Sequence, residues 1–192
     1  IHMYVDGDII NRAYLLPGML HRGFEKSMER RTWMNNIALI PRICVPEPDT
    51  NEMVYAMNIE TLAKIQVPER ADWIRMLILE LARLSAHLMA FGGIGGPTGL
   101  YSAMYWAQAD RDLILTLFEE ITGQRIYHMY IVAGGVRKDL PKGIEKKIIE
   151  FLDDLESRLP DYEDLVLNNP TILARIKDNI LLPKEVVWEL GV

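Results

Sequence analysis

The stretch "MLILELARLSAHLMAF", residues 76–91, decides the fold. Apolar residues occupy nearly all sides of the helix that this stretch would form, which is typical of a buried helix at the centre of a bundle. Pro68 precedes it and suits a first helical position, where the missing N–H is not needed. The run "GGIGGP", residues 92–97, follows as a stop signal. The sequence therefore predicts a long central helix over about residues 68–91.

Further helices are predicted on both sides of the central one. Asp49 or Thr50 is the expected N-cap of a helix that runs to about Ile65. Thr98 is the expected cap of another, which ends at Gly123, and a third spans residues 142–159. Shorter helices complete the chain.

The remaining segments are predicted to be mixed. A broken helix is expected over residues 24–40. The Asp6–Gly7 pair predicts a β-hairpin within residues 3–16, and residues 125–132 have the composition of an extended segment. We expect one mainly α domain over residues 1–192, a multi-helix bundle with minor β.

Composition narrows the classes of function. The 192 residues carry a net charge of −6, which argues against a nucleic-acid binder. The single cysteine excludes an internal disulfide framework and fits a reducing compartment. No run of 18 apolar residues is free of charge, so we expect no direct membrane span.

Glu80, Arg83 and His87 form a polar stripe on the central helix, at spacing i, i+3, i+7. A metal or proton site is one interpretation, but metal-binding bundles repeat Glu-x-x-His on facing helices. No second copy exists here, so we favour a buried, paired structural network. The glycine runs at 92–97 and 134–141 lack the strand or the Lys-Ser/Thr ending of a phosphate loop, so no nucleotide site is predicted.

Two short motifs carry the candidate chemistry. "HRGFEKSMERR", residues 21–31, is by itself an ordinary solvated helix start. "RICVPEPD", residues 42–49, holds the only cysteine, Cys44, and places Glu47 where a second thiolate would complete Cys-x-x-Cys. Together the motifs contain Arg-Gly-x-Glu followed by Arg-x-Cys-x-x-Glu.

This pairing resembles the first signature of nickel–iron hydrogenase large subunits. It resembles still more closely the 49 kDa (D) subunit of respiratory complex I, whose metal-binding cysteines are gone. "LHRGFEK", "VPERADWIRMLILELARLSAHL", "DRDLILTLFEEITGQR" and "GGVRKDLP" are similar to that family in order and spacing. The resemblance implies the helical part of a longer family chain, which has a β-rich stretch before this part and further sequence after it.

Three branches of the superfamily are compared at the second motif. The quinone-reducing branch has a tyrosine near the position of Val45. The hydrogenase branch has two Cys-x-x-Cys pairs, of which the second would lie past Val192. The motif is closest to the Mbx type, the membrane-bound sulfane sulfur reductase, which resembles a hydrogenase without its nickel site.

The resemblance implies a role for six residues. Arg22, Glu25, Cys44 and Glu47 are the expected catalytic residues, with Glu25 as proton carrier. His21, Arg22 and Arg42 are expected near a [4Fe–4S] cluster held by a partner subunit. Cys44 is expected to attack polysulfide beside Arg22 or Arg42, or else to be a small buried hydrophobe. One thiol and one hard carboxylate suit no nickel–iron centre, so no bound metal is expected.

The function that the resemblance implies is that of a substrate-site component in an NADH- or ferredoxin-linked, ion-pumping oxidoreductase. Electrons would pass from an iron–sulfur subunit to a quinone or sulfur-type acceptor, while other subunits handle NAD or ferredoxin. Membrane subunits are further expected partners, with the chain peripheral on the cytoplasmic face of the membrane. The alternative is a non-catalytic helical scaffold within such a complex.

Overall fold

The computed structural model describes residues 1–178 and 182–191. The chain forms two compact units, residues 1–39 and residues 40–192. The single domain predicted over residues 1–192 stays a prediction.

The N-terminal unit contains the expected hairpin. Strands β1 (His2–Asp6) and β2 (Ile9–Tyr14) pair antiparallel, with Asp6 opposite Ile9. Two short helices follow, α1 (Phe24–Glu29) and α2 (Trp33–Asn36). The helix expected over residues 24–40 is thus two separate pieces, and the Thr32 side chain caps the second by accepting from the Asn35 N–H at 3.4 Å.

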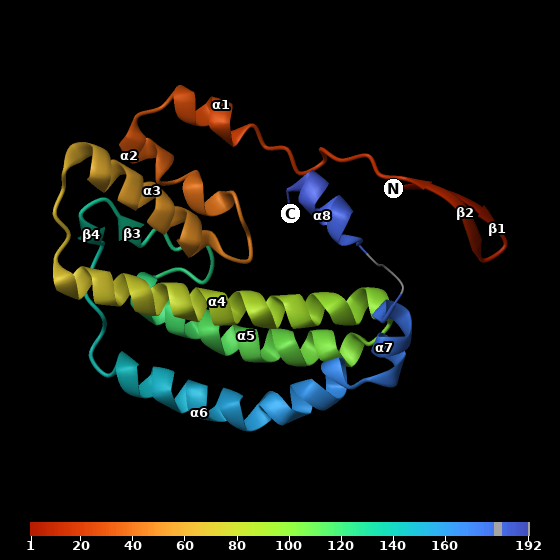
Figure 1. Ribbon diagram of the computed structural model, residues 1–192. Helices are drawn as coiled ribbons and strands as arrows, with labels where there is room; N and C mark the ends of the chain where they lie inside the picture. The colour runs from red at the N-terminus through yellow and green to blue at the C-terminus, as the bar shows by residue number, and fades with distance from the viewer. Residues whose placement is uncertain (179–181, 192) are drawn as a thin grey trace. The chain divides into compact units, whose positions relative to one another are not determined.

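The helical unit begins with the 3₁₀ turn η1 (Ile40–Arg42) and contains four long helices (Figure 1). These are α3 (Pro48–Ala63), α4 (Glu69–Thr98), α5 (Tyr101–Thr122) and α6 (Ile144–Tyr162). Strands β3 (Ile131–Val132) and β4 (Gly135–Val136) form a small antiparallel pair. The π-helix η2 (Glu163–Leu167) and helices α7 (Pro170–Ile176) and α8 (Lys184–Leu190) complete the unit.

The helical unit is layered around α4 and α5, which run side by side (Figure 1). Helix α3 and the β3–β4 pair pack against α4, while α6 packs against α5. The core between these layers is filled by side chains that are almost wholly buried: Ile78, Ile114, Phe118, Ile121 and Ile144. The predicted mainly α bundle around a long central helix is confirmed.

The prediction that the glycine run stops the central helix was wrong. Helix α4 continues through residues 92–97 and ends at Thr98, before Gly99 in the left-handed conformation (φ 80°). Gly95 lies against the start of α5, where a Cβ atom would come within 2.6 Å of the Leu100 carbonyl oxygen. The glycines therefore permit close packing of α4 on α5. Thr98 accordingly does not cap α5 and instead donates to the Ile94 carbonyl at 2.7 Å.

Helix α3 begins slightly earlier than expected. Pro48 is its first residue and Glu47 takes the N-cap position, so Asp49 lies inside the helix and is fully buried. The other predicted helices agree with the structure within a few residues, and Gly123 ends α5 with φ 87°.

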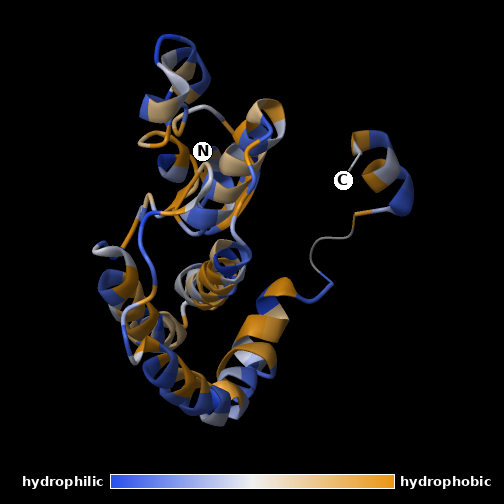
Figure 2. Cartoon of the chain, turned by 90° about the vertical axis from the view of Figure 1, so that its left-hand side faces the viewer, coloured by the Kyte–Doolittle hydropathy of each residue, from blue (hydrophilic) through white to orange (hydrophobic). Residues whose placement is uncertain are grey.

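Among the described residues, α4 is the one helix long and apolar enough to cross a membrane by length and composition. It packs against α3, α5 and α7, and core helices share this composition. Figure 2 shows that hydrophobic and hydrophilic residues are interleaved along the long helices. The absence of a membrane span stays a prediction.

Candidate functional site

The first three predicted site residues lie in the N-terminal unit. His21 and Arg22 precede Gly23, whose left-handed conformation (φ 61°) turns the chain into α1. Glu25 is exposed in the first turn of this helix, where the helix dipole favours a carboxylate.

The other three predicted residues lie in the helical unit, at the end of η1 and on the loop that follows it. Arg42 is half-buried, and its Nη1 donates to the Met129 sulfur at 3.8 Å while its guanidinium carbon lies 5.2 Å from the centre of the Tyr127 ring. Cys44 is a partly exposed free thiol. Glu47 is half-buried, and its carbonyl accepts from the Asn51 side chain at 3.2 Å. The expected roles of these six residues, and the action of Arg22, Glu25 and Cys44 in one place, stay predictions.

The sequence predicts no metal centre at this loop. Cys44 and Glu47 supply one thiol and one carboxylate, and no group of three or more His, Cys, Asp or Glu side chains gathers as metal ligands within residues 1–178 and 182–191. The donor set does not suit a nickel–iron centre, which needs several thiolates.

Sequence reasoning missed a set of buried carboxylates, which lie on the inner face of α3. Asp49 is fully buried, and its two carboxylate oxygens lie 2.9 and 3.0 Å from Nδ1 of His128. The other ring nitrogen of His128 lies 3.2 Å from the Arg125 carbonyl oxygen. The ring also stacks on Phe118, with centroids 4.0 Å apart. The buried His128 thus bridges α3, α5 and its own loop.

Glu52, one turn further along α3, binds the backbone beside His128. Its carboxylate accepts from the N–H groups of Met129, Tyr130 and Ile131 at 2.7, 3.0 and 3.1 Å. Burial raises the pKa of Glu52 to about 7, and the negative charge of Asp49 adds to the rise, against the lowering effect of these hydrogen bonds. Glu52 therefore changes its protonation near neutral pH.

Glu60 at the far end of α3 forms a buried ion pair with Arg75 of α4. Arg75 Nη2 lies 2.5 Å from Glu60 Oε1 and also donates to the Val132 carbonyl at 2.8 Å, while its Nε donates to the Gly135 carbonyl at 3.1 Å. Burial raises the pKa of Glu60, but the hydrogen bonds from Arg75 and Gly134 and the charge of Arg75 lower it below its ordinary value. Three carboxylates of α3 therefore hold the connection between α5 and α6.

The spacing of these carboxylates was a usable signal. Asp49, Glu52 and Glu60 recur at helical spacing, which places them on one face of α3. An acidic stripe on a predicted bundle helix indicates partners on a neighbouring segment. The partners themselves were harder to foresee because most are backbone N–H groups.

The prediction of a buried network at Glu80, Arg83 and His87 was wrong. Glu80 and Arg83 form an ion pair, but their side chains are 49% and 58% exposed, and His87 is exposed as well. The pair is therefore solvated. The buried arginine of α4 is Arg75, which is 1% exposed.

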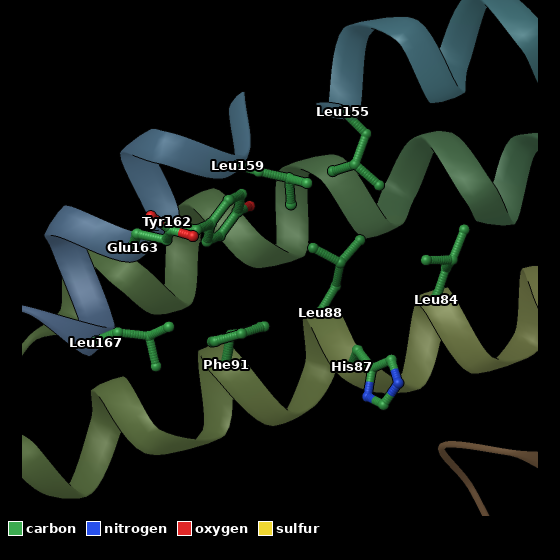
Figure 3. A pocket seen from close by; sticks show the side chains of 9 residues that line it. All are labelled: Leu84, His87, Leu88, Phe91, Leu155, Leu159, Tyr162, Glu163 and Leu167. Carbon is green, nitrogen blue, oxygen red and sulfur yellow. The ribbon is translucent and has the colours of Figure 1, made fainter. Parts of the chain in front are cut away.

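An apolar groove lies between α4 and the α6–η2 segment (Figure 3). Its volume is about 420 Å³. Leu88 and Phe91 point toward Leu155, Leu159 and Tyr162 across it, with His87 at the edge. The Tyr162 hydroxyl donates to Asp110 at 2.5 Å, and His87 and Glu163 are the other polar residues that line the groove.

Comparisons with known proteins agree on one class. The family described as "Respiratory-chain NADH dehydrogenase, 49 Kd subunit" matches residues 97–192, half of the chain. The D subunit of the NADH-quinone oxidoreductase of Thermosipho melanesiensis is 62% identical over the whole chain, which covers 52% of that protein. The D subunit of the F(420)H(2) dehydrogenase of Methanosarcina mazei is 35% identical over the whole chain and 51% of its own length.

A solved structure agrees as well. A chain of the membrane-bound sulfane sulfur reductase, an archaeal respiratory membrane complex, is 40% identical with a TM-score of 0.92. The match covers 99% of this chain and 51% of that one, so the chain spans about half the length of the relatives it matches.

Fold and relatives define a class of helical subunits from respiratory oxidoreductase complexes. The chain belongs to the family of the 49 kDa subunit of respiratory-chain NADH dehydrogenase. The resemblance inferred from the sequence motifs is confirmed.

Proposed function

We propose that the chain acts as the substrate-site component of a membrane-associated, NADH- or ferredoxin-linked oxidoreductase. It passes electrons from a neighbouring iron–sulfur subunit to a quinone or sulfur-type acceptor. The observation that carries the proposal is the 40% identity and TM-score of 0.92 to a chain of the sulfane sulfur reductase over nearly the whole length of this one. NAD or ferredoxin is handled by other subunits.

The η1–α3 loop supports the acceptor role. Cys44 is a partly exposed free thiol on this loop, two positions along the chain from Arg42. In the sulfur branch of the proposal, the thiolate breaks an S–S bond of polysulfide, releases the shorter chain and keeps one sulfur as a persulfide. Two electrons from the partner and one proton then release hydrosulfide and restore the thiolate.

Arg22 and Glu25 take the electron-side and proton-side roles in the proposal. A guanidinium near the partner's cluster favours the reduced cluster on Coulomb grounds. The Glu25 carboxylate is exposed at the start of α1, where water reaches it. The family relation supports partners in membrane subunits and a position on the cytoplasmic face.

The test assembles Glu25→Gln and Arg22→Met into the complete complex. Glu25→Gln is expected to slow acceptor reduction about 10²-fold, the scale for a positioned acid or base, while electron entry into the neighbouring cluster survives. Arg22→Met is expected to lower the reduction potential of the cluster. If neither variant changes turnover or potential, the catalytic proposal is wrong.

The second candidate is a helical scaffold without a substrate site. The absence of a second thiol at Glu47 favours it, because the metal site of the hydrogenase motif cannot form there. Cys44→Ser decides between the two in the sulfur branch: a scaffold keeps full turnover with polysulfide, whereas an acceptor site loses most of it.

A further inference from the structure

The turn formed by Tyr127, His128 and Met129 has a strained backbone. Tyr127 has φ 59° and Met129 has φ 46°, the left-handed region that bulky side chains rarely occupy. Such a conformation is unfavourable for a residue with a side chain and persists only where surrounding contacts impose it. The contacts that impose it are therefore specific to this turn.

Those contacts come from α3, far away in the sequence. Asp49 binds the His128 ring between the two strained residues, and Glu52 accepts from three successive N–H groups that begin at Met129. Asp49, Glu52 and His128 are 0%, 2% and 3% exposed. We call these three residues the α3 clamp.

The Tyr127–Met129 turn contacts Arg42, which lies at the start of the candidate acceptor loop. The guanidinium of Arg42 lies over the Tyr127 ring, and Nη1 donates to the Met129 sulfur, so both strained residues contact it. Each contact is weak by itself. Both contacts to Arg42 exist only while the turn keeps its conformation.

The α3 clamp brings two carboxyl groups and an imidazole together. Both ring nitrogens of His128 lie within hydrogen-bond distance of oxygen atoms, Nδ1 of the Asp49 carboxylate and Nε2 of the Arg125 carbonyl. Glu52 adds a second carboxyl group beside Asp49. Arg111 of α5 and Arg125 of the same segment line the small cavity next to Asp49 and His128, and Arg111 donates to Ser85 at 3.1 Å.

We propose that Asp49, Glu52 and His128 are positioning residues of the acceptor site, which hold the Tyr127–Met129 turn beneath Arg42 and release it more readily when the Glu52 carboxyl group loses its proton. The inference deepens the proposed function and rests on it, since it assigns Arg42 a role at the acceptor. The clamp itself can be tested without any turnover.

The sign of the proton effect follows from linkage. In the closed turn the pKa of Glu52 is raised to about 7, because of burial and the charge of Asp49. Once the turn opens, water reaches Glu52 and its pKa returns toward the ordinary value of 4.5. Opening therefore releases a proton, and rising pH favours opening.

The experiment measures amide hydrogen exchange of Met129, Tyr130 and Ile131 in the assembled complex between pH 5 and pH 8. After correction for intrinsic exchange, protection is expected to fall about tenfold to a hundredfold over this range. Glu52→Gln, which cannot ionise, is expected to flatten the profile. Asp110→Asn removes a buried carboxylate from the α5–α6 contact and is the matched control, expected to keep the wild-type profile.

If amide protection in the wild-type complex does not change between pH 5 and pH 8, the proposal is wrong. This result does not depend on the folding of any variant. Should Glu52→Gln fail to assemble, Asp49→Asn serves as the second variant and is expected to lower protection at all pH values.

The role of the α3 clamp in acceptor reduction is tested by measuring kcat and KM for polysulfide and for a water-soluble quinone across the same pH range. A positioning role predicts that Glu52→Gln changes the pH profile of kcat for the acceptor that is reduced. An unchanged profile with the expected exchange pattern overturns the role of the clamp in catalysis. If the wild-type complex reduces neither acceptor, the proposed function fails, while the exchange data still decide the clamp.

Discussion

Glu60 and Glu80 are each paired with an arginine, but only the first pair is buried. Arg75 and Glu60 have side chains 1% and 10% exposed, whereas the Glu80–Arg83 pair lies half in water. Water screens a solvated pair and competes for its hydrogen bonds, so such pairs add little to stability. Removing one partner of a buried pair leaves an unpaired charge in the interior.

Glu60→Ala is therefore expected to lower the free energy of unfolding by about 3 kcal/mol or more, because it strands Arg75. Glu80→Ala should change it little. Urea unfolding of both variants beside the wild type is the measurement. Equal losses for the two substitutions would mean that exposure does not separate the two pairs.

At the scale of the elements, the junction of α4 and α5 depends on one glycine. A Cβ atom on Gly95 would lie 2.6 Å from the Leu100 carbonyl oxygen and 3.1 Å from the Ala103 Cβ, both on the backbone or stem of the facing segment. Neither neighbour can move without shifting a helix. Gly93 is two positions away on the same helix and has no atom within 4 Å of such a Cβ.

Gly95→Ala is expected to destabilise the protein by roughly 1–3 kcal/mol through overpacking. Gly93→Ala, the matched control, should be neutral or stabilising by up to about 1 kcal/mol, since alanine is the better helix former. Thermal unfolding of both variants measures the difference. A stabilising Gly95→Ala would show that α5 approaches α4 less closely than described.

The sequence predicted the elements well where periodicity or a turn signal was strong. The apolar stretch at residues 76–91, the Asp6–Gly7 turn and Gly123 each led to the observed element. The end of α4 was mispredicted because a glycine run is read locally as a stop, while here it permits helix contact. Tertiary packing decided this boundary.

The candidate site was less predictable for a similar reason. Arg42 and Cys44 were found through their motif, and the structure adds Tyr127 and Met129 as contacts of Arg42. His128 and Glu52 were missed because their partners are a distant carboxylate and backbone N–H groups. No single-segment pattern reveals such long-range pairs.

At the scale of the whole molecule, buried carboxylates make folding depend on pH in two opposite ways. The raised pKa of Glu52 means that the folded state binds a proton which the unfolded state releases above pH 4.5. Its contribution to stability is fully present below that pH and is lost as pH rises through about 7. The pKa of Glu60 is lowered, so its contribution is present above its ordinary pKa and is lost as pH falls.

Glu60 and Glu52 therefore change the free energy of unfolding over different pH ranges, and near neutral pH the change comes from Glu52. Between pH 5 and pH 8 the wild type is expected to lose roughly 2–3 kcal/mol of unfolding free energy relative to Glu52→Gln, which has no carboxyl proton to release. Urea unfolding of both proteins at pH 5, 6, 7 and 8 gives this difference, and comparing them cancels the titration of groups that do not interact with Glu52. A difference that stays constant with pH would mean that Glu52 is ionised throughout, held by the three N–H groups of the turn strongly enough to offset its burial beside Asp49.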